Sequence, residues 1–276
     1  MKRYLKNIPF ALLIFVVISC STSQEPFSFI QICDPQLGMG GYEHDVATLG
    51  QALQQVNELD VDFVIFCGDL VHHANEDSYA DFKSITSGLN IPFYCVPGNH
   101  DVGMVPNDTT LAFYRSTMGE DYFSFQHKGV SFIFTNSQLW KTDIGEESQR
   151  HDLWFNQTLT NKDSAERTIV IGHFPIYIKS IDEKETYSNL PPEKRERLLE
   201  TFSKNNVGAY LSGHKHEVII NNFKGIQLVT GESTSKNFDK RPMGFRKWEV
   251  SADTLFHSFV ALEAQQVADT TFQAMN

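Results

Sequence analysis

Residues 61–69 have the sequence Val-Asp-Phe-Val-Ile-Phe-Cys-Gly-Asp, an almost continuous apolar run that stops at a glycine and an aspartate. A short run of β-branched and aromatic residues predicts a strand that is buried on both faces. The preceding residues 45–59 have apolar side chains at helical spacing, and residues 27–33 form another strand-like run that ends at Asp34. The order strand, helix, strand predicts a βαβ unit with polar residues after the carboxyl ends of its parallel strands.

This pattern continues toward the C-terminus. A helix is predicted at 78–87 and a buried strand at 91–96, and strands 122–125 and 130–135 flank a Lys128-Gly129 turn as a hairpin. The later elements are predicted in this order: helix 149–159, strand 168–172, helix 191–203, strand 207–212 and a closing β-meander of strands 217–223, 225–230, 245–250 and 254–260. The hairpins predict a second sheet packed on the first, and we expect an α/β fold with one core.

The composition favours a globular chain with a large core. Hydrophobic residues make up 41% of the 276 residues, and 22 of them are phenylalanine, which excludes a disordered or fibrous chain. Cys33, Cys67 and Cys95 lie in apolar runs and are predicted to be small buried side chains rather than a disulfide framework. The formal charge of −11 repels nucleic acid. We therefore expect no nucleic acid polymer as a partner.

The N-terminus has the anatomy of a secretion signal. Lys2, Arg3 and Lys6 precede the apolar run 8–18, which is shorter than the ~20 residues needed to span a bilayer. The run ends in Val17-Ile18-Ser19-Cys20, which resembles a bacterial lipobox, where the cysteine is lipidated and becomes the mature N-terminus. The alternatives are a plain secretory signal and an ordinary membrane anchor.

The lipobox also predicts how the chain is divided and where it works. The predicted divisions are a lipoprotein signal peptide (1–19), a tether (20–26), one folded domain (27–262) and a C-terminal tail (263–276). We expect a protein of the cell envelope, on the periplasmic or outer side, that is held at the membrane by lipidated Cys20.

Five segments carry oxygen or imidazole donors directly after predicted strands: Asp34-Pro35-Gln36, Gly68-Asp69, Gly98-Asn99-His100-Asp101, Gly172-His173 and Gly213-His214-Lys215-His216. Each segment alone could be a turn, a helix cap or a solvated loop. Together, at the ends of five strands, they predict a metal site, because the carboxyl ends of strands in an open α/β sheet build ligand sites. The mixture of donors suits Mn²⁺, Fe²⁺ or Zn²⁺, and it contains no thiolate.

The five segments resemble the signature of the calcineurin-like metallophosphoesterases, and the resemblance extends from about residue 27 to residue 260. Residues 67–72, 121–125, 136–138 and 180–183 further resemble the small calcineurin-like phosphoesterase-domain serine/threonine phosphatases. The resemblance implies a four-layer α/β/β/α sandwich of two mixed sheets. It also implies that the domain hydrolyses phosphate esters, so that the expected partner is a phosphoprotein or a small phosphorylated compound.

Carried over to this sequence, the resemblance implies two divalent metal ions, which are Mn, Fe, Zn or Mg. The implied ligands are Asp34, Gln36 and His216 for the first ion and Asn99, His173 and His214 for the second, with Asp69 bridging both. Most of the wider family has histidine at the position of Gln36. The amide oxygen is a harder donor than imidazole, so it favours Mn²⁺ or Mg²⁺ at that position.

The implied reaction is the attack of a metal-bridging hydroxide on the phosphorus of a phosphate monoester. His100 would protonate the leaving alkoxide, and Asp69 or Asp101 is expected to bind its other ring nitrogen. The alternatives are a phosphodiesterase or nucleotide hydrolase with the same metals, and a non-catalytic binding lipoprotein. Residues 102–120 and 174–192 are expected to set the specificity. Candidates for a phosphate clamp are Arg115, Arg241 and Arg246.

Overall fold

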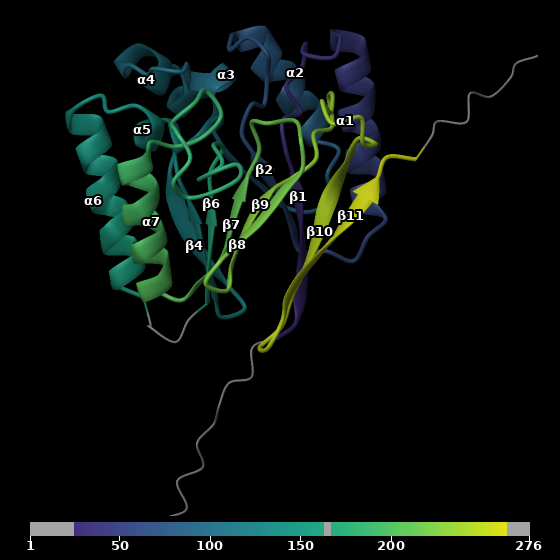
Figure 1. Cartoon of the computed structure of the whole chain (residues 1–276). Helices are drawn as coiled ribbons and strands as arrows, with labels where there is room; N and C mark the ends of the chain where they lie inside the picture. The colour runs from purple at the N-terminus through teal and green to yellow at the C-terminus, as the bar shows by residue number, and fades with distance from the viewer. Residues whose placement is uncertain (1–24, 163–166, 264–276) are drawn as a thin grey trace, which may run out of the picture.

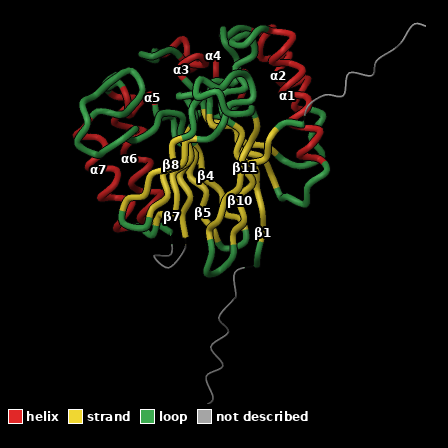
Figure 2. The backbone as a smooth tube through the Cα atoms, turned by 45° about the vertical axis from the view of Figure 1, so that its right-hand side comes forward, coloured by secondary structure: helices red, strands yellow, loops and turns green. Residues whose placement is uncertain are grey.

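Two mixed sheets pack face to face, and helices cover both outer faces, in the computed structural model of the protein (Figure 1). The structure describes residues 25–162 and 167–263. Figure 2 shows the four layers, with α6 and α7 on one side of the strands and α1 and α2 on the other. The predicted α/β/β/α sandwich is therefore confirmed.

The first sheet has the order β11-β10-β1-β2-β3. Its strands are β1 (Phe27–Ile32), β2 (Phe63–Cys67), β3 (Phe93–Val96), β10 (Gly244–Val250) and β11 (Leu255–Ala261). Strands β1, β2 and β3 are parallel, as the βαβ pattern predicted, and β10 pairs with β1 in the antiparallel direction. Helices α1 (Tyr42–Asn57) and α2 (Glu76–Thr86) pack on the outer face of this sheet.

The second sheet has the order β4-β5-β6-β7-β9-β8. Its strands are β4 (Phe123–His127), β5 (Val130–Phe134), β6 (Arg167–Ile171), β7 (Val207–Ser212), β8 (Ile219–Phe223) and β9 (Ile226–Thr230). The four central strands are parallel, and the edge strands β4 and β8 are antiparallel to their neighbours. Helices α6 (Glu146–Thr160) and α7 (Pro192–Lys204) cover its outer face.

Aromatic side chains fill the space between the sheets. The ring of Phe29 stacks on Phe63 at 5.3 Å and on Trp248 at 5.9 Å, and the edge of Phe132 from the second sheet meets it at 5.4 Å. Burying one such side chain stabilises a fold by roughly 1.5–3 kcal/mol, so this cluster holds the two sheets at a defined separation. The phenylalanine content of the sequence is thus concentrated where the sheets meet.

The predicted closing β-meander is wrong. Strands β8 and β9 form a hairpin in the second sheet, whereas β10 and β11 form a hairpin in the first. The residues between them cross from one sheet to the other, and Ser233 forms an isolated bridge with Cys33 after β1. Alternation along a strand identifies the strand but does not identify its partner, which explains the error.

Three short helices were also not predicted: α3 (Asn99–Val102), α4 (Asp108–Met118) and α5 (Gln138–Lys141). The start of α4 has a local signal, because the side chain of Asn107 accepts from the backbone N–H of Thr109 and Thr110 as an N-cap. These helices lie in the loops at the end of the sheets where the polar segments gather (Figures 1 and 2).

The predicted absence of a disulfide framework is confirmed for these three cysteines, and the predicted burial is confirmed for Cys33 and Cys67. Cys33 and Cys67 are buried, Cys95 is half-buried, and all three are free thiols. The predicted signal peptide and Cys20 lie outside the described residues. Within residues 25–162 and 167–263, no helix is both long and apolar enough to cross a membrane.

Candidate metal centre

The structure brings all seven predicted metal ligands to the same end of the two sheets. Each follows a strand or begins the loop after it, and each side chain is buried: Asp34, Gln36, Asp69, Asn99, His173, His214 and His216. Parallel strands place their carboxyl ends at one edge, and the two sheets face each other there. The segments therefore meet although up to 182 residues separate them in the chain.

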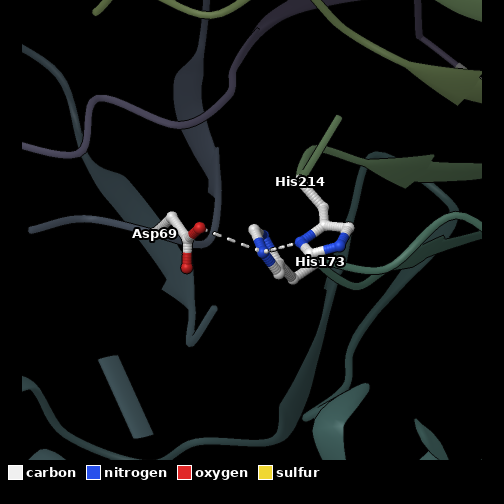
Figure 3. A group of neighbouring side chains, drawn as sticks. All are labelled: Asp69, His173 and His214. Atoms are coloured by element: carbon white, nitrogen blue, oxygen red, sulfur yellow. Dashed lines mark hydrogen bonds and ion pairs between the residues drawn. The ribbon is translucent and has the colours of Figure 1, made fainter. Parts of the chain in front are cut away.

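Three donor atoms surround Nε2 of His173, and Figure 3 shows two of the side chains that carry them, Asp69 and His214. This Nε2 lies 3.2 Å from Asn99 Oδ1, 3.2 Å from His214 Nδ1 and 3.3 Å from Asp69 Oδ2. Neighbouring ligands on one ion with bonds of about 2.0–2.2 Å are separated by roughly 3.0–3.5 Å. The donors of Asp69, His173 and His214 all lie within 4.8 Å of one another. This arrangement fits a divalent cation.

Asp34, Gln36 and His216 adjoin this group: Asp34 Oδ1 lies 3.8 Å from His173 Nδ1, and the backbone N–H of Gln36 donates to Asp69 O at 2.8 Å. The Asp34 carboxylate is 4.0 Å from His216 Nε2, and it accepts the backbone N–H of His214 at 2.8 and 3.0 Å. The amide nitrogen of Gln36 lies 3.3 Å from His72 Nδ1, while its buried Oε1 has no hydrogen-bond partner. An unpaired buried carbonyl oxygen is costly, and a metal ion would satisfy it.

Backbone carbonyls orient the four histidines of the centre. His173 Nδ1 donates to Cys67 O at 2.8 Å, and His214 Nε2 donates to Tyr187 O at 3.2 Å. His216 Nδ1 donates to Lys236 O at 2.7 Å, and His100 Nδ1 donates to His72 O at 2.9 Å. Because a carbonyl oxygen only accepts, the bonded nitrogen carries the hydrogen. The other ring nitrogen of His173, His214 and His216 can bind a metal ion once it carries no hydrogen, whereas that of His100 must carry a hydrogen to act as a proton donor.

The backbone of the centre is held in an unusual conformation. Five of the seven predicted ligands have positive φ: Asp34 (47°), Gln36 (34°), Asp69 (49°), His214 (73°) and His216 (51°). Residues with a side chain adopt this region at a cost of order 1–3 kcal/mol, which persists only where the surroundings enforce it. The concentration of this strain at the ligands marks the site as functional rather than as a set of ordinary turns.

Gly98 explains why glycine belongs to the segment that ends β3. A Cβ added there would overlap the carboxylate and the backbone nitrogen of Asp69. The close approach lets the backbone N–H of His100 donate to Asp69 Oδ1 at 2.8 Å, so that one carboxylate oxygen is bound by the loop and the other faces His173.

The ionisable side chains of the centre shift one another's pKa values. Burial lowers the pKa of His173, but the Asp69 carboxylate outweighs it and raises this pKa to about 9. Burial and the charge of His173 lower the pKa of His214 to about 3. Burial raises the pKa of Asp34 above its usual range. His173 therefore holds a proton at neutral pH, and a metal ion must displace that proton to bind.

The predicted partner of the His100 ring is wrong. Its Nδ1 binds the carbonyl oxygen of His72 rather than Asp69 or Asp101. Asp101 instead accepts the backbone N–H of Gly98 at 2.7 Å and of Leu70 at 3.1 Å, and burial raises the pKa of its carboxyl to about 7. Asp101 thus joins the loop after β2 to the loop after β3.

Several residues that complete the centre were not singled out from the sequence. The hydroxyls of Ser233 and Ser235 both donate to the backbone oxygen of Asp34 at 2.9 Å, and Ser137 accepts the backbone N–H of His173. Residues 231–235 carry the same signal as the five recognised segments, because they are polar residues directly after the buried strand β9. That signal would have identified the two serines.

The arginines do not form a phosphate clamp. Arg115 binds Asp121 at 2.6 Å and also Glu147, and buried Arg246 binds Glu232 at 2.7 Å. The Arg241 guanidinium lies 4.0 Å from the same Glu232 carboxylate. The guanidinium groups of Arg115 and Arg246 are thus engaged within the fold, whereas the Arg241 side chain is 47% exposed.

Comparison with known proteins identifies relatives of the chain. The chain matches the calcineurin-like phosphoesterase family over residues 27–218. It is 31% identical over 266 residues to the serine/threonine-protein phosphatase CPPED1 of Bos taurus, and the aligned region covers 86% of this chain and 84% of that protein. It is 24% identical over 225 residues to a probable cyclic nucleotide phosphodiesterase of Ruthia magnifica, covering 80% and 92% of the two chains.

Solved structures show the same fold. A dimetal phosphatase from Danio rerio superposes with a TM-score of 0.67 at 14% sequence identity, covering 84% of this chain and 95% of that chain. At this identity the likeness is one of fold, and the chemistry must be argued from the residues of the centre.

Proposed function

The chain belongs to the calcineurin-like phosphoesterase family, and we propose that it is a metal-dependent phosphomonoesterase. The observation that carries the proposal is the meeting of Asn99, Asp69 and His214 around His173, with donor atoms 3.2–3.3 Å from its Nε2. The family is hydrolytic and uses a dinuclear divalent metal site.

We assign Asn99, His173 and His214 to one ion, and Asp34, Gln36 and His216 to the other, with Asp69 between them. The ions would be Mn, Fe, Zn or Mg, and the amide oxygen of Gln36 favours Mn²⁺ or Mg²⁺ at its position. When bound, such a pair lowers the pKa of water and neutralises the charge of the phosphate.

The chain's own groups then supply orientation and a proton. The Nδ1 of His100 is held by the His72 carbonyl, so its Nε2 is the nitrogen that can deliver a proton to the leaving oxygen. The same residue donates its backbone N–H to Asp69, which ties the proton donor to the metal-binding carboxylate. Asp101 acts on this arrangement by holding the two loops together.

We propose a phosphoprotein or a small phosphorylated compound as the substrate. The CPPED1 relative, named a serine/threonine-protein phosphatase, supports the phosphoprotein. The similarity to a probable cyclic nucleotide phosphodiesterase supports the second candidate, a phosphodiesterase with the same ions. A diesterase needs room for a second ester arm, so the two activities differ in the walls of the site rather than in the ligands.

A comparison of p-nitrophenyl phosphate with bis(p-nitrophenyl) phosphate tests the proposal. With Mn²⁺ added, we expect the monoester to be hydrolysed at least about tenfold faster, because a site built for one ester arm discriminates against a second. The same preparation is analysed for its metals. Equal rates for the two compounds would contradict the monoesterase and favour the diesterase.

We also propose that the protein is a lipoprotein of the cell envelope, anchored by lipidated Cys20. The support is the basic n-region, the apolar run 8–18 and the lipobox-like residues 17–20. In a bacterial host grown with labelled palmitate, the full chain is expected to take up label and to sediment with membranes, whereas the Cys20→Ser variant takes up none. Equal labelling of both chains would contradict the anchor.

A further inference from the structure

Two exposed aromatic side chains lie directly against the histidines of the metal centre. The ring of Tyr187 lies 4.9 Å from the ring of His214, and the ring of Phe238 stacks on His216 at 4.9 Å with an angle of 22° between the planes. Tyr187 is 57% exposed and Phe238 is 47% exposed. We call this pair the aromatic rim.

The tyrosine of the rim is held in place by the centre itself. Its backbone oxygen accepts from His214 Nε2 at 3.2 Å, and its hydroxyl accepts from the Asn99 amide at 3.3 Å. The first contact uses the backbone and orients the histidine, so it does not depend on the side chain. The second contact and the packing on His214 fix the tyrosine ring beside one group of ligands, while more than half of the residue stays exposed.

Charged side chains anchor the loop that carries Tyr187. Glu183 accepts the backbone N–H of Ile178 at 2.7 Å, and Lys141 donates to the backbone oxygens of Thr186 at 2.6 Å and Asn189 at 2.8 Å. The guanidinium of Arg195, which is fully buried, donates to the backbone oxygens of Leu190, Ile181 and Glu183 at 2.6–2.9 Å. A loop with this many internal bonds presents the tyrosine in one place.

The loop that carries Phe238 is anchored in a similar way. The backbone N–H of Phe238 donates to His216 O at 2.7 Å, and Asn237 binds Ser233 N and Pro242 O. Ser233 in turn donates to the backbone of Asp34. The rim thus has one ring on the ligands assigned to each metal ion.

We propose that the aromatic rim binds the alcohol portion of the substrate, and that the site prefers phosphate monoesters whose alcohol carries a planar ring. This inference rests on the proposed phosphomonoesterase. Large aromatic faces are normally buried, and rings fixed in the open gain by contact with another ring. A phosphate held between the ligands of both ions would leave the rest of the ester beside Tyr187 and Phe238.

Binding of phosphonates tests the rim without a chemical step. Phenylphosphonate and methylphosphonate carry the same head group and have no ester bond to hydrolyse, so their dissociation constants compare only the ring with the methyl group. We expect the metal-loaded wild type to prefer phenylphosphonate by about 10-fold or more, and each of Tyr187→Ser and Phe238→Ser to reduce this preference by roughly 3- to 10-fold. The methylphosphonate dissociation constant of each protein is the reference for its own preference, so a change that affects both ligands equally does not alter the ratio.

Two further variants sharpen the test. Phe256 lies on β11 opposite Glu249 of β10 and is 57% exposed, as Tyr187 is. Phe256→Ser therefore removes an equally exposed aromatic ring away from the centre, and it should leave the preference for phenylphosphonate unchanged. Tyr187→Phe keeps the ring and should also keep the preference. If Tyr187→Phe lost it like Tyr187→Ser, the hydroxyl rather than the ring would be responsible, and the inference would be overturned.

Metal content and thermal unfolding are measured for every variant, so that a damaged centre is recognised. Wild-type protein that hydrolyses p-nitrophenyl phosphate but binds the two phosphonates equally would overturn the aromatic rim and leave the proposed function intact. Wild-type protein that hydrolyses no monoester would overturn the proposed function, whatever it binds.

Discussion

Replacing Asp69 by alanine is expected to abolish phosphate ester hydrolysis and to lower the metal content of the protein at the same time. Asp69 is buried between the two groups of ligands, with Oδ2 3.3 Å from His173 Nε2 and Oδ1 bound to the His100 backbone. Removing it deletes a ligand of both proposed ions and the negative charge that would offset theirs. The rate should fall on the order of 10³-fold or more, as for other groups that act as a unit.

The measurement combines elemental analysis with hydrolysis of p-nitrophenyl phosphate. Asp62→Ala is the matched control, because Asp62 directly precedes β2 and pairs with His127 and Lys128 rather than with the centre. The control should keep its metals and its rate. Wild-type hydrolysis by a pure Asp69→Ala preparation would contradict the assignment of Asp69 to the catalytic centre.

Replacing His100 by alanine is expected to separate catalysis from metal binding. Its Nδ1 is occupied by the His72 carbonyl, and Nε2 is the nitrogen available to protonate a leaving group. A positioned general acid contributes roughly 10²- to 10⁴-fold, so kcat should fall by that factor while both metals remain bound.

The leaving group makes this prediction more specific. p-Nitrophenolate leaves without much help from a proton, whereas the alkoxide of phosphoserine needs one, so His100→Ala should slow phosphoserine hydrolysis far more than p-nitrophenyl phosphate hydrolysis. His127→Ala is the control, because His127 lies on β4 and pairs with Asp62; this variant should change neither rate. Loss of metal from His100→Ala would make His100 a ligand. An equal decrease in the hydrolysis rates of phosphoserine and p-nitrophenyl phosphate would rule out proton donation.

Local patterns in the sequence were sufficient for the elements and for most of the centre. Residues 61–69 and 27–34 predicted parallel strands because buried strands are continuous apolar runs that end in turn residues. The five donor segments stood directly after such strands, so their meeting at one edge followed from the geometry of parallel sheets. Residues 231–235 carried the same signal, and their serines hold Asp34.

Contacts between distant residues decided the rest. The carbonyl that orients His173 comes from Cys67, 106 positions earlier, and the carbonyl that orients His214 comes from Tyr187. The same kind of contact replaced the expected carboxylate partner of His100 by a backbone oxygen and divided the last four strands between two sheets.

The sequence by itself thus determined which side chains could bind metal and that they follow strands, because apolar periodicity and turn residues are local properties of the chain. The tertiary structure alone decided which nitrogen of each histidine faces the centre, and it placed Tyr187 and Phe238 beside two of them. The physical reason is that hydrogen bonds to backbone oxygens and contacts between loops depend on where the sheets bring the chain back to itself.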